Sequence, residues 1–190
     1  MQVLKFGGTS VANAENINKV TAIIKRKIHQ DKIVVVVSAL GGITDTLLNC
    51  GVLAAAGDET YKEQLHQAES RHIETVRSLV PITQQSSILS FVKKSCNEME
   101  DMCNGVFMVG ELSDKSKDKI MSYGELLSSQ IIAAYFSAIG MDCTWKDSRE
   151  LIRTDSHFGY AAVDFHTTNK NIQDFFSTAK NALFIVPGFI

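Results

Sequence analysis

Four short apolar runs along the chain predict the strands of a parallel sheet. Ile33–Val37 is a continuous β-branched run without alternation, which is typical of a strand covered on both faces. Shorter runs at Met1–Leu4, Met141–Trp145 and Ala182–Val186 predict three more strands. Parallel neighbours need crossover connections, so helices are expected between these strands.

The stretches between the apolar runs have helical periodicity. The 59–108 stretch is polar-rich and divided by Pro81, which predicts a helical hairpin beside the sheet. Ile120–Ile139 carries apolar residues around most of its circumference, so this helix should be largely buried and end at Gly140. Further helices are predicted after Asn13, over residues 43–57 and over residues 167–180, whereas residues 151–164 read as an irregular or hairpin segment.

This alternation predicts an α/β fold, a three-layer α/β/α sandwich with a mostly parallel sheet. The 190 residues, 45% apolar and 21% charged, are enough for one globular domain over residues 1–190, without an internal repeat.

Composition and charge narrow the function classes. A net charge of −2 gives no broad basic surface for nucleic acid, so any anion site must be local. The four cysteines form no Cys-x-x-Cys pair and the histidines are scattered, so we expect reduced thiols and no protein metal site. No apolar run approaches the roughly 20 residues of a membrane span, and no secretory leader is recognisable, which favours the cytoplasm.

The segment Lys5-Phe6-Gly7-Gly8-Thr9-Ser10-Val11 is the strongest candidate for chemistry. A strand that breaks into two glycines and two hydroxyl residues before a helix exposes backbone amides to an anion, with an ammonium alongside. The predicted phosphate-binding residues are Lys5, Phe6, Gly7, Gly8, Thr9 and Ser10. The alternative is a strand, turn and helix whose glycines only allow tight geometry, with Lys5 at the surface. The chain contains neither Gly-x-Gly-x-x-Gly after a strand nor the Gly-Lys-Ser/Thr of a P-loop.

Two more glycine-bearing turns, Gly41-Gly42 and Pro187-Gly188, also follow predicted strands. Because ligands of open α/β sheets gather beyond the carboxyl ends of the strands, we expect the three turns to share one site. Thr44 could bind a substrate carboxylate at a helix start or simply cap that helix. Glu125 lies on an apolar stripe and needs a partner, either a ligand ammonium or a lysine such as Lys117 or Lys119.

The heptad Lys5–Val11 resembles the signature of aspartate kinases in the amino-acid kinase superfamily. Ser38–Thr44, Gly124–Ser128 and Gly188–Ile190 are similar to further blocks of that family. The resemblance implies an amino-acid kinase-like fold, catalysis by Lys5, and aspartate binding by Thr44, Glu125 and Phe189. Phe189 could instead be a core phenylalanine.

The resemblance further implies phosphoryl transfer from ATP, as its Mg²⁺ complex, to the side-chain carboxylate of L-aspartate. It covers only the front part of a kinase domain, so we expect an inactive fragment of a longer, oligomeric enzyme. The first 14 residues look most like bifunctional aspartokinase–homoserine dehydrogenases. The alternatives are a kinase for glutamate, acetylglutamate or a nucleotide, and a non-catalytic module that binds a ligand or dimerises.

Overall fold

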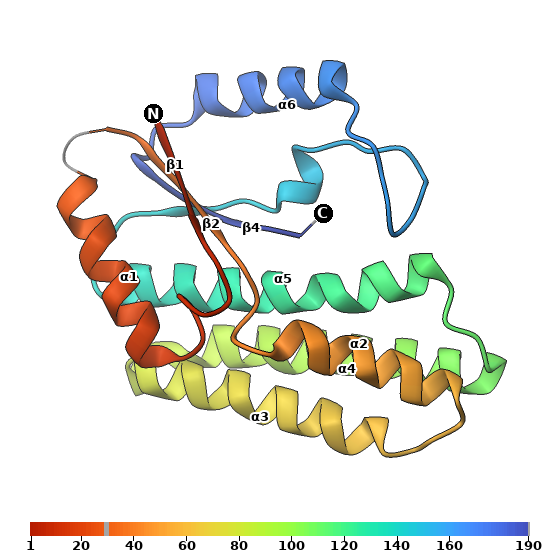
Figure 1. Cartoon of the computed structure of the whole chain (residues 1–190). Helices are drawn as coiled ribbons and strands as arrows, with labels where there is room; N and C mark the ends of the chain where they lie inside the picture. Colours follow the sequence, from red (N-terminus) through yellow and green to blue (C-terminus); the bar gives the residue numbers. More distant parts are fainter. Residues whose placement is uncertain (29–30, 190) are drawn as a thin grey trace.

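The computed structural model describes residues 1–28 and 31–189, which form a parallel sheet flanked by helices (Figure 1). Its strands are β1 (Gln2–Phe6), β2 (Ile33–Val37), β3 (Thr144–Trp145) and β4 (Leu183–Pro187). They are ordered β1-β2-β4-β3 and all pairs are parallel. The predicted parallel sheet is confirmed. β1 extends two residues further than predicted, however, and β3 is only two residues long.

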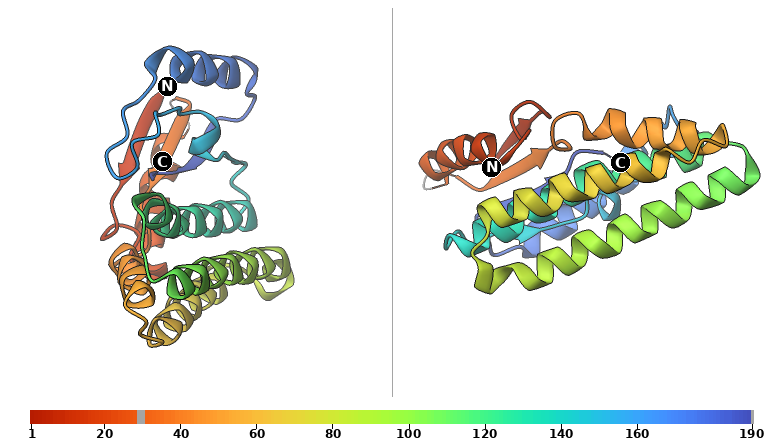
Figure 2. Two further views of the ribbon diagram at one scale, coloured as in Figure 1. Left: turned by 90° about the vertical axis from the view of Figure 1, so that its right-hand side faces the viewer. Right: turned by 90° about the horizontal axis from the view of Figure 1, so that it is seen from below.

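The two faces of the sheet are covered by different helices, which gives the predicted three layers (Figure 2). One face packs on α6 (Phe165–Thr178), where Phe175 and Phe176 surround Phe184 of β4. The other face packs against α1 (Ala14–Lys27) and α5 (Asp114–Ala138), and their apolar side chains together form the main hydrophobic core. The continuous β-branched run of β2 is therefore buried from both sides, as its composition predicts.

The remaining helices form a further layer beyond α5. They are α2 (Ile43–Ala55), α3 (Tyr61–Leu79) and α4 (Gln85–Val109), and short 3₁₀ turns span Ile82–Gln84 and Ser148–Glu150. α3 and α4 form the predicted hairpin, but it packs on α2 and α5 and not beside the sheet (Figure 2). The apolar side chains of α5 face both neighbours, which explains why that helix is buried around most of its circumference. None of the described helices combines the length and apolar character needed to cross a membrane.

The residues at which the helices begin and end are explained by local glycine conformations and capping side chains. Gly140, with φ +77°, terminates α5 as predicted, because glycine adopts this left-handed conformation without strain. α6 begins two residues earlier than predicted, at Phe165, because the Asp164 side chain accepts a hydrogen bond from the Thr167 amide and caps the helix. A Thr154–Val163 antiparallel bridge confirms a hairpin in the 151–164 segment. All four cysteines are free thiols.

Candidate functional site

The three glycine-bearing turns meet at the carboxyl edge of the sheet. The strand register aligns Phe6, Val37 and Pro187 on β1, β2 and β4, and the turn that follows each strand therefore starts at the same level. A Cβ atom at Gly41 would lie 2.8 Å from the Cβ of Ala12, and the Gly188 amide donates to the Val37 carbonyl at 2.9 Å. The structure thus brings together three turns that are distant in sequence.

The first turn is held in one conformation by its own backbone. The Ser10 and Val11 amides both donate to the Gly7 carbonyl, at 2.9 and 3.3 Å, and the Asn16 side-chain amide donates to the Thr9 carbonyl at 2.8 Å. The turn can therefore offer the amides of Gly8 and Thr9 to an anion. It leads into α1, whose N-terminus carries a partial positive charge.

Lys5 and Phe6 lie on strand β1 and point to opposite faces. Lys5 is opposite Val36 and exposed, and its charge lowers the pKa of Glu125. The half-buried Phe6 ring packs on the main core, and the Phe6 carbonyl accepts a hydrogen bond from the Ser38 amide. The part that Phe6 plays in the phosphate site stays a prediction.

Glu125 is a buried carboxylate with an unused oxygen. The residue is only 6% exposed; Oε1 accepts a 3.4 Å hydrogen bond from the Ser38 hydroxyl, and Oε2 has no partner among the described residues. Burial raises the pKa of Glu125, against smaller lowering effects from the Ala39 amide, the Ser38 hydroxyl and the Lys5 charge. A buried carboxylate is costly unless it is paired, so this oxygen is suited to a cationic ligand group.

The lysines considered as partners of Glu125 are engaged elsewhere. Lys117 pairs with Asp114 at 3.9 Å, and the Lys119 ammonium lies 5.3 Å from the centre of the Tyr123 ring. The alternative of a Glu125 ion pair with either lysine is therefore wrong. The absence of that pairing leaves the carboxylate available to a ligand.

Two contacts fix Glu125 against the turn after β2. Gly124 brings α5 so close that a Cβ there would lie 2.8 Å from the Cβ of Ala39. One turn later the buried Ser128 hydroxyl donates to the Ser38 carbonyl at 2.7 Å. Ser38 and Ser128 were not identified as site residues from the sequence. Ser38 could have been recognised as a candidate from the sequence, because it directly follows a predicted buried strand. Ser128 could be suspected only because it lies three residues after Glu125 on the same helix.

Thr44 lies in the first turn of α2 and does not cap it. The cap is Gly42, with φ +78° and no side-chain hydrogen bond, so the N-capping alternative for Thr44 is wrong. The half-buried Thr44 hydroxyl and the first amides of α2 are therefore grouped at a helix N-terminus, which favours a negatively charged group.

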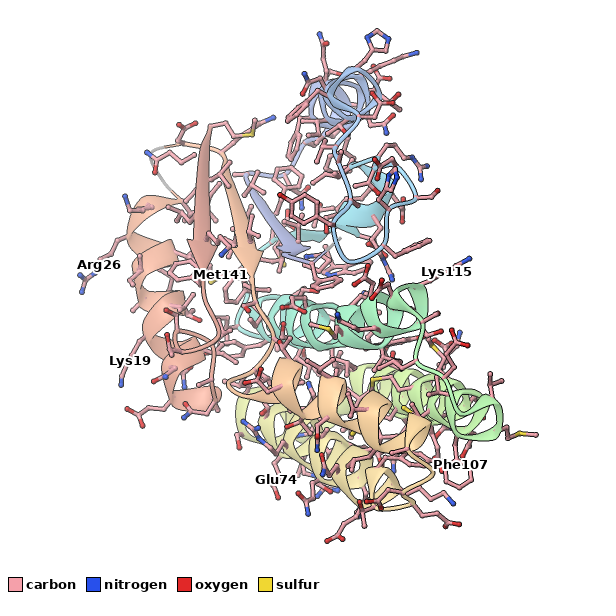
Figure 3. All side chains as sticks on the ribbon, turned by 45° about the vertical axis from the view of Figure 1, so that its right-hand side comes forward. Lys19, Arg26, Glu74, Phe107, Lys115 and Met141 are labelled. Atoms are coloured by element: carbon pink, nitrogen blue, oxygen red, sulfur yellow. The ribbon has the colours of Figure 1, made fainter. Side chains whose placement is uncertain are left out.

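Phe189 lines a cavity of about 400 Å³ beside the N-terminal half of α5. The half-buried ring belongs to the cavity wall and not to the core, together with Ser122, which lies one turn before Glu125. Lys115, labelled in Figure 3, and Lys119 contribute positive charge to the same wall. The structure thus places Phe189 next to the α5 face that carries Glu125.

The described residues contain no group of three or more His, Cys, Asp and Glu side chains that could hold a metal ion.

Comparison with known proteins identifies the family. The model of the amino acid kinase family matches residues 1–190. Bifunctional aspartokinase/homoserine dehydrogenase 1 of Arabidopsis thaliana is 30% identical over 189 residues, covering 99% of this chain and 21% of the relative. Aspartokinase 1 of the same plant is 35% identical over 158 residues, which cover 80% of this chain and 26% of the relative. The chain belongs to the amino acid kinase family.

A solved structure confirms the fold. Escherichia coli aspartokinase III in complex with aspartate and ADP superposes with a TM-score of 0.85 at 24% identity, covering 99% of this chain and 40% of that one. The amino-acid kinase-like fold expected from the sequence is therefore confirmed. The chain spans about a fifth to a quarter of the length of the two curated Arabidopsis relatives, at 21% and 26%.

Proposed function

We propose that this chain forms the substrate-binding and phosphate-binding part of an aspartate kinase. The observation that carries the proposal is the buried Glu125 carboxylate, which accepts a hydrogen bond from Ser38 at the start of the second turn and keeps one oxygen free. An amino-acid ammonium would satisfy this oxygen. The names of the relatives, and the aspartate and ADP bound by the Escherichia coli neighbour, support this choice of substrates.

In the proposed complex the ends of L-aspartate are bound by different elements. Glu125 accepts hydrogen bonds from the ammonium. The Thr44 hydroxyl and the Thr44 and Asp45 amides bind a carboxylate, because the Ile43 amide already donates to the Leu40 carbonyl. Phe189 closes the pocket. The remaining carboxylate is directed at the turn after β1. Because it is already ionised near neutral pH, it needs no general base.

The chief obstacle to the reaction is repulsion between two anions. At about 4 Å each pair of like charges costs roughly 1 kcal/mol in water and about 4 kcal/mol at an effective dielectric constant near 20. The Lys5 ammonium and the Gly8 and Thr9 amides would offset this repulsion and stabilise the charge that develops during transfer. These donors also suit the phosphates of ATP, which would bring Mg²⁺ with it.

The proposed reaction transfers one phosphoryl group. A side-chain carboxylate oxygen of aspartate forms a bond to the γ-phosphorus as the bond to the β,γ-bridging oxygen breaks. ADP leaves, and the product is the acyl phosphate 4-phospho-L-aspartate. We further propose that the chain works within a longer polypeptide, because the curated relatives that it matches are several times longer. Self-association and a cytoplasmic location are proposed from the resemblance and the sequence alone.

The test is an assay of the complete polypeptide with a panel of acceptors. We expect ADP release that depends on aspartate, and trapping of the acyl phosphate by hydroxylamine as a hydroxamate. Equal or faster turnover with glutamate, acetylglutamate or a nucleoside monophosphate would contradict the assignment of aspartate.

The same assay on residues 1–190 alone tests whether this part is sufficient. We expect negligible turnover and weak aspartate binding by calorimetry. Rapid phosphorylation of aspartate by the 190-residue chain would contradict this expectation. Absence of activity in the complete polypeptide, with binding retained, would favour a non-catalytic ligand-binding module.

A further inference from the structure

Arg71 contacts the second glycine turn from outside the site. Its guanidinium Nη2 donates a 2.8 Å hydrogen bond to the Gly41 carbonyl, which links α3 to a turn 30 residues earlier in the chain. Arg71 lies on the exposed side of α3, one turn before Glu74, which is labelled in Figure 3. A hydrogen bond with a charged donor is stronger than one between neutral groups.

The contacted carbonyl lies directly before α2. A peptide unit is planar and trans, so fixing the Gly41 carbonyl also fixes the Gly42 N–H, which points the opposite way, away from α3. The next carbonyl, that of Gly42, accepts from both the Thr46 amide, at 3.1 Å, and its hydroxyl, at 3.0 Å. The entry to α2 is therefore held on both sides of Gly42, although no side chain caps it.

The turn has little freedom to absorb a movement of this carbonyl. Gly41 has no room for a side chain beside Ala12, whereas Gly42 adopts a left-handed φ of +78°. A shift of the Gly41–Gly42 peptide would therefore be transmitted to the Thr44 hydroxyl, two residues later, and to the first amides of α2.

We infer that Arg71 is a positioning residue that orients the N-terminus of α2 for binding of the substrate carboxylate. This inference rests on the proposed function, since it assigns Arg71 to the carboxylate half of that same site. Arg71 does not touch the substrate. Its guanidinium also adds positive charge behind the helix end that receives the carboxylate.

The test compares Arg71→Ala and Arg71→Lys with Arg77→Ala in the complete enzyme. Arg77 is an exposed cation on the same helix and controls for loss of charge. We expect Arg71→Ala to raise the KM for aspartate about 5- to 10-fold with kcat and the KM for ATP within about 2-fold. Arg71→Lys should recover part of that loss, and Arg77→Ala should match the wild type.

Hydrogen exchange separates this inference from the proposed function. The amides of residues 42–46 should exchange faster in Arg71→Ala than in Arg77→Ala, whether or not the enzyme is active. Unchanged exchange together with an unchanged KM for aspartate would overturn the role of Arg71, as would equal effects of both alanine variants. A wild-type enzyme that fails to phosphorylate aspartate would overturn the proposed function, while the exchange result would still decide whether Arg71 orders the turn.

Discussion

Gly124 of α5 lies against Ala39 so closely that a Cβ atom at position 124 would be 2.8 Å from the Cβ of Ala39. This distance is far below ordinary van der Waals contact. A helix-interior glycine normally costs about 1 kcal/mol relative to alanine. Here the glycine allows the carboxylate of the next residue, Glu125, to approach the turn after β2.

Gly124→Ala tests this close approach. We expect a net loss of roughly 1–3 kcal/mol in the free energy of unfolding, because overpacking outweighs the better helix propensity of alanine. The KM for aspartate should also rise, since α5 must move away from the turn. The measurements are denaturant unfolding and steady-state kinetics.

Gly105→Ala is the matched control. Gly105 also lies inside a helix, α4, but a Cβ there would meet no atom within 4 Å. This variant should be unchanged or more stable by up to about 1 kcal/mol. Equal destabilisation by both substitutions would show that the contact with Ala39 is unimportant.

Lys5→Ala tests whether the Lys5 ammonium neutralises negative charge on the transferred phosphoryl group. We expect kcat to fall by at least about 100-fold, equivalent to about 2.7 kcal/mol of transition-state stabilisation. Because the Lys5 side chain is exposed, the melting temperature should change little. Lys25→Ala, at the far end of α1 and equally exposed, should keep wild-type turnover. Near-normal turnover of the Lys5 variant would remove this residue from the mechanism.

Glu125→Gln tests the ammonium site. We expect aspartate affinity to fall at least about 100-fold, because the ion pair and the negative charge are lost. Stability without ligand should be unchanged, or higher by about 1 kcal/mol, since a buried charge is removed. Glu100→Gln, on the exposed side of α4, should alter neither quantity. Calorimetric titration with aspartate and thermal unfolding measure the two effects.

Glu125 also predicts a pH dependence of binding and of stability. Burial raises its pKa, so its contribution to stability is fully present below the ordinary pKa and is lost as pH rises through the raised value. Aspartate binding should change in the opposite direction, weakening as pH falls and Glu125 becomes protonated. Glu125→Gln should abolish both trends.

His72 predicts acid sensitivity in the helical layer. The residue is 0% exposed and its Nδ1 lies 2.7 Å from the Ala68 carbonyl, while burial lowers its pKa to about 4 from an ordinary 6.5. A lowered histidine pKa means that stability is full above the ordinary pKa and declines as pH falls from about 6.5 towards 4.

The expected loss attributable to His72 is roughly 3 kcal/mol over this range of pH. Urea unfolding of the wild type and of His72→Gln at several pH values measures it as a difference in slope. His66→Gln, on the exposed side of the same helix, should keep the wild-type slope. A wild-type slope in His72→Gln would show that another group causes the acid sensitivity.

Strong local signals made much of this fold predictable from the sequence. The unbroken β-branched run Ile33–Val37 predicts a doubly covered strand, and Gly140 marks the end of α5 because a left-handed residue favours glycine. The packing of the α3–α4 hairpin was not predictable, since an apolar helix face does not by itself indicate which element will cover it. The sequence predicts the start of α6 two residues too late, because the helix is capped by Asp164.

The candidate site was predictable only in part. The three glycine-bearing turns could be brought together from the rule that parallel strands end at one edge, and the structure confirms their convergence. The roles of Lys5, Thr44, Glu125 and Phe189 stay predictions. The free oxygen of Glu125 and the contact of Arg71 with Gly41 depend on tertiary packing, which no local pattern encodes.

The position of β4 in the sheet limits the order in which the parts of the molecule can fold. This strand comes last among the four in the chain, yet it lies between β2 and β3. During synthesis the helices α2 to α5 can collapse on one another early, whereas β2 keeps an unpaired edge until residues 183–187 leave the ribosome. We therefore expect nascent chains halted before residue 183 to hold a helical subdomain beside an aggregation-prone apolar strand.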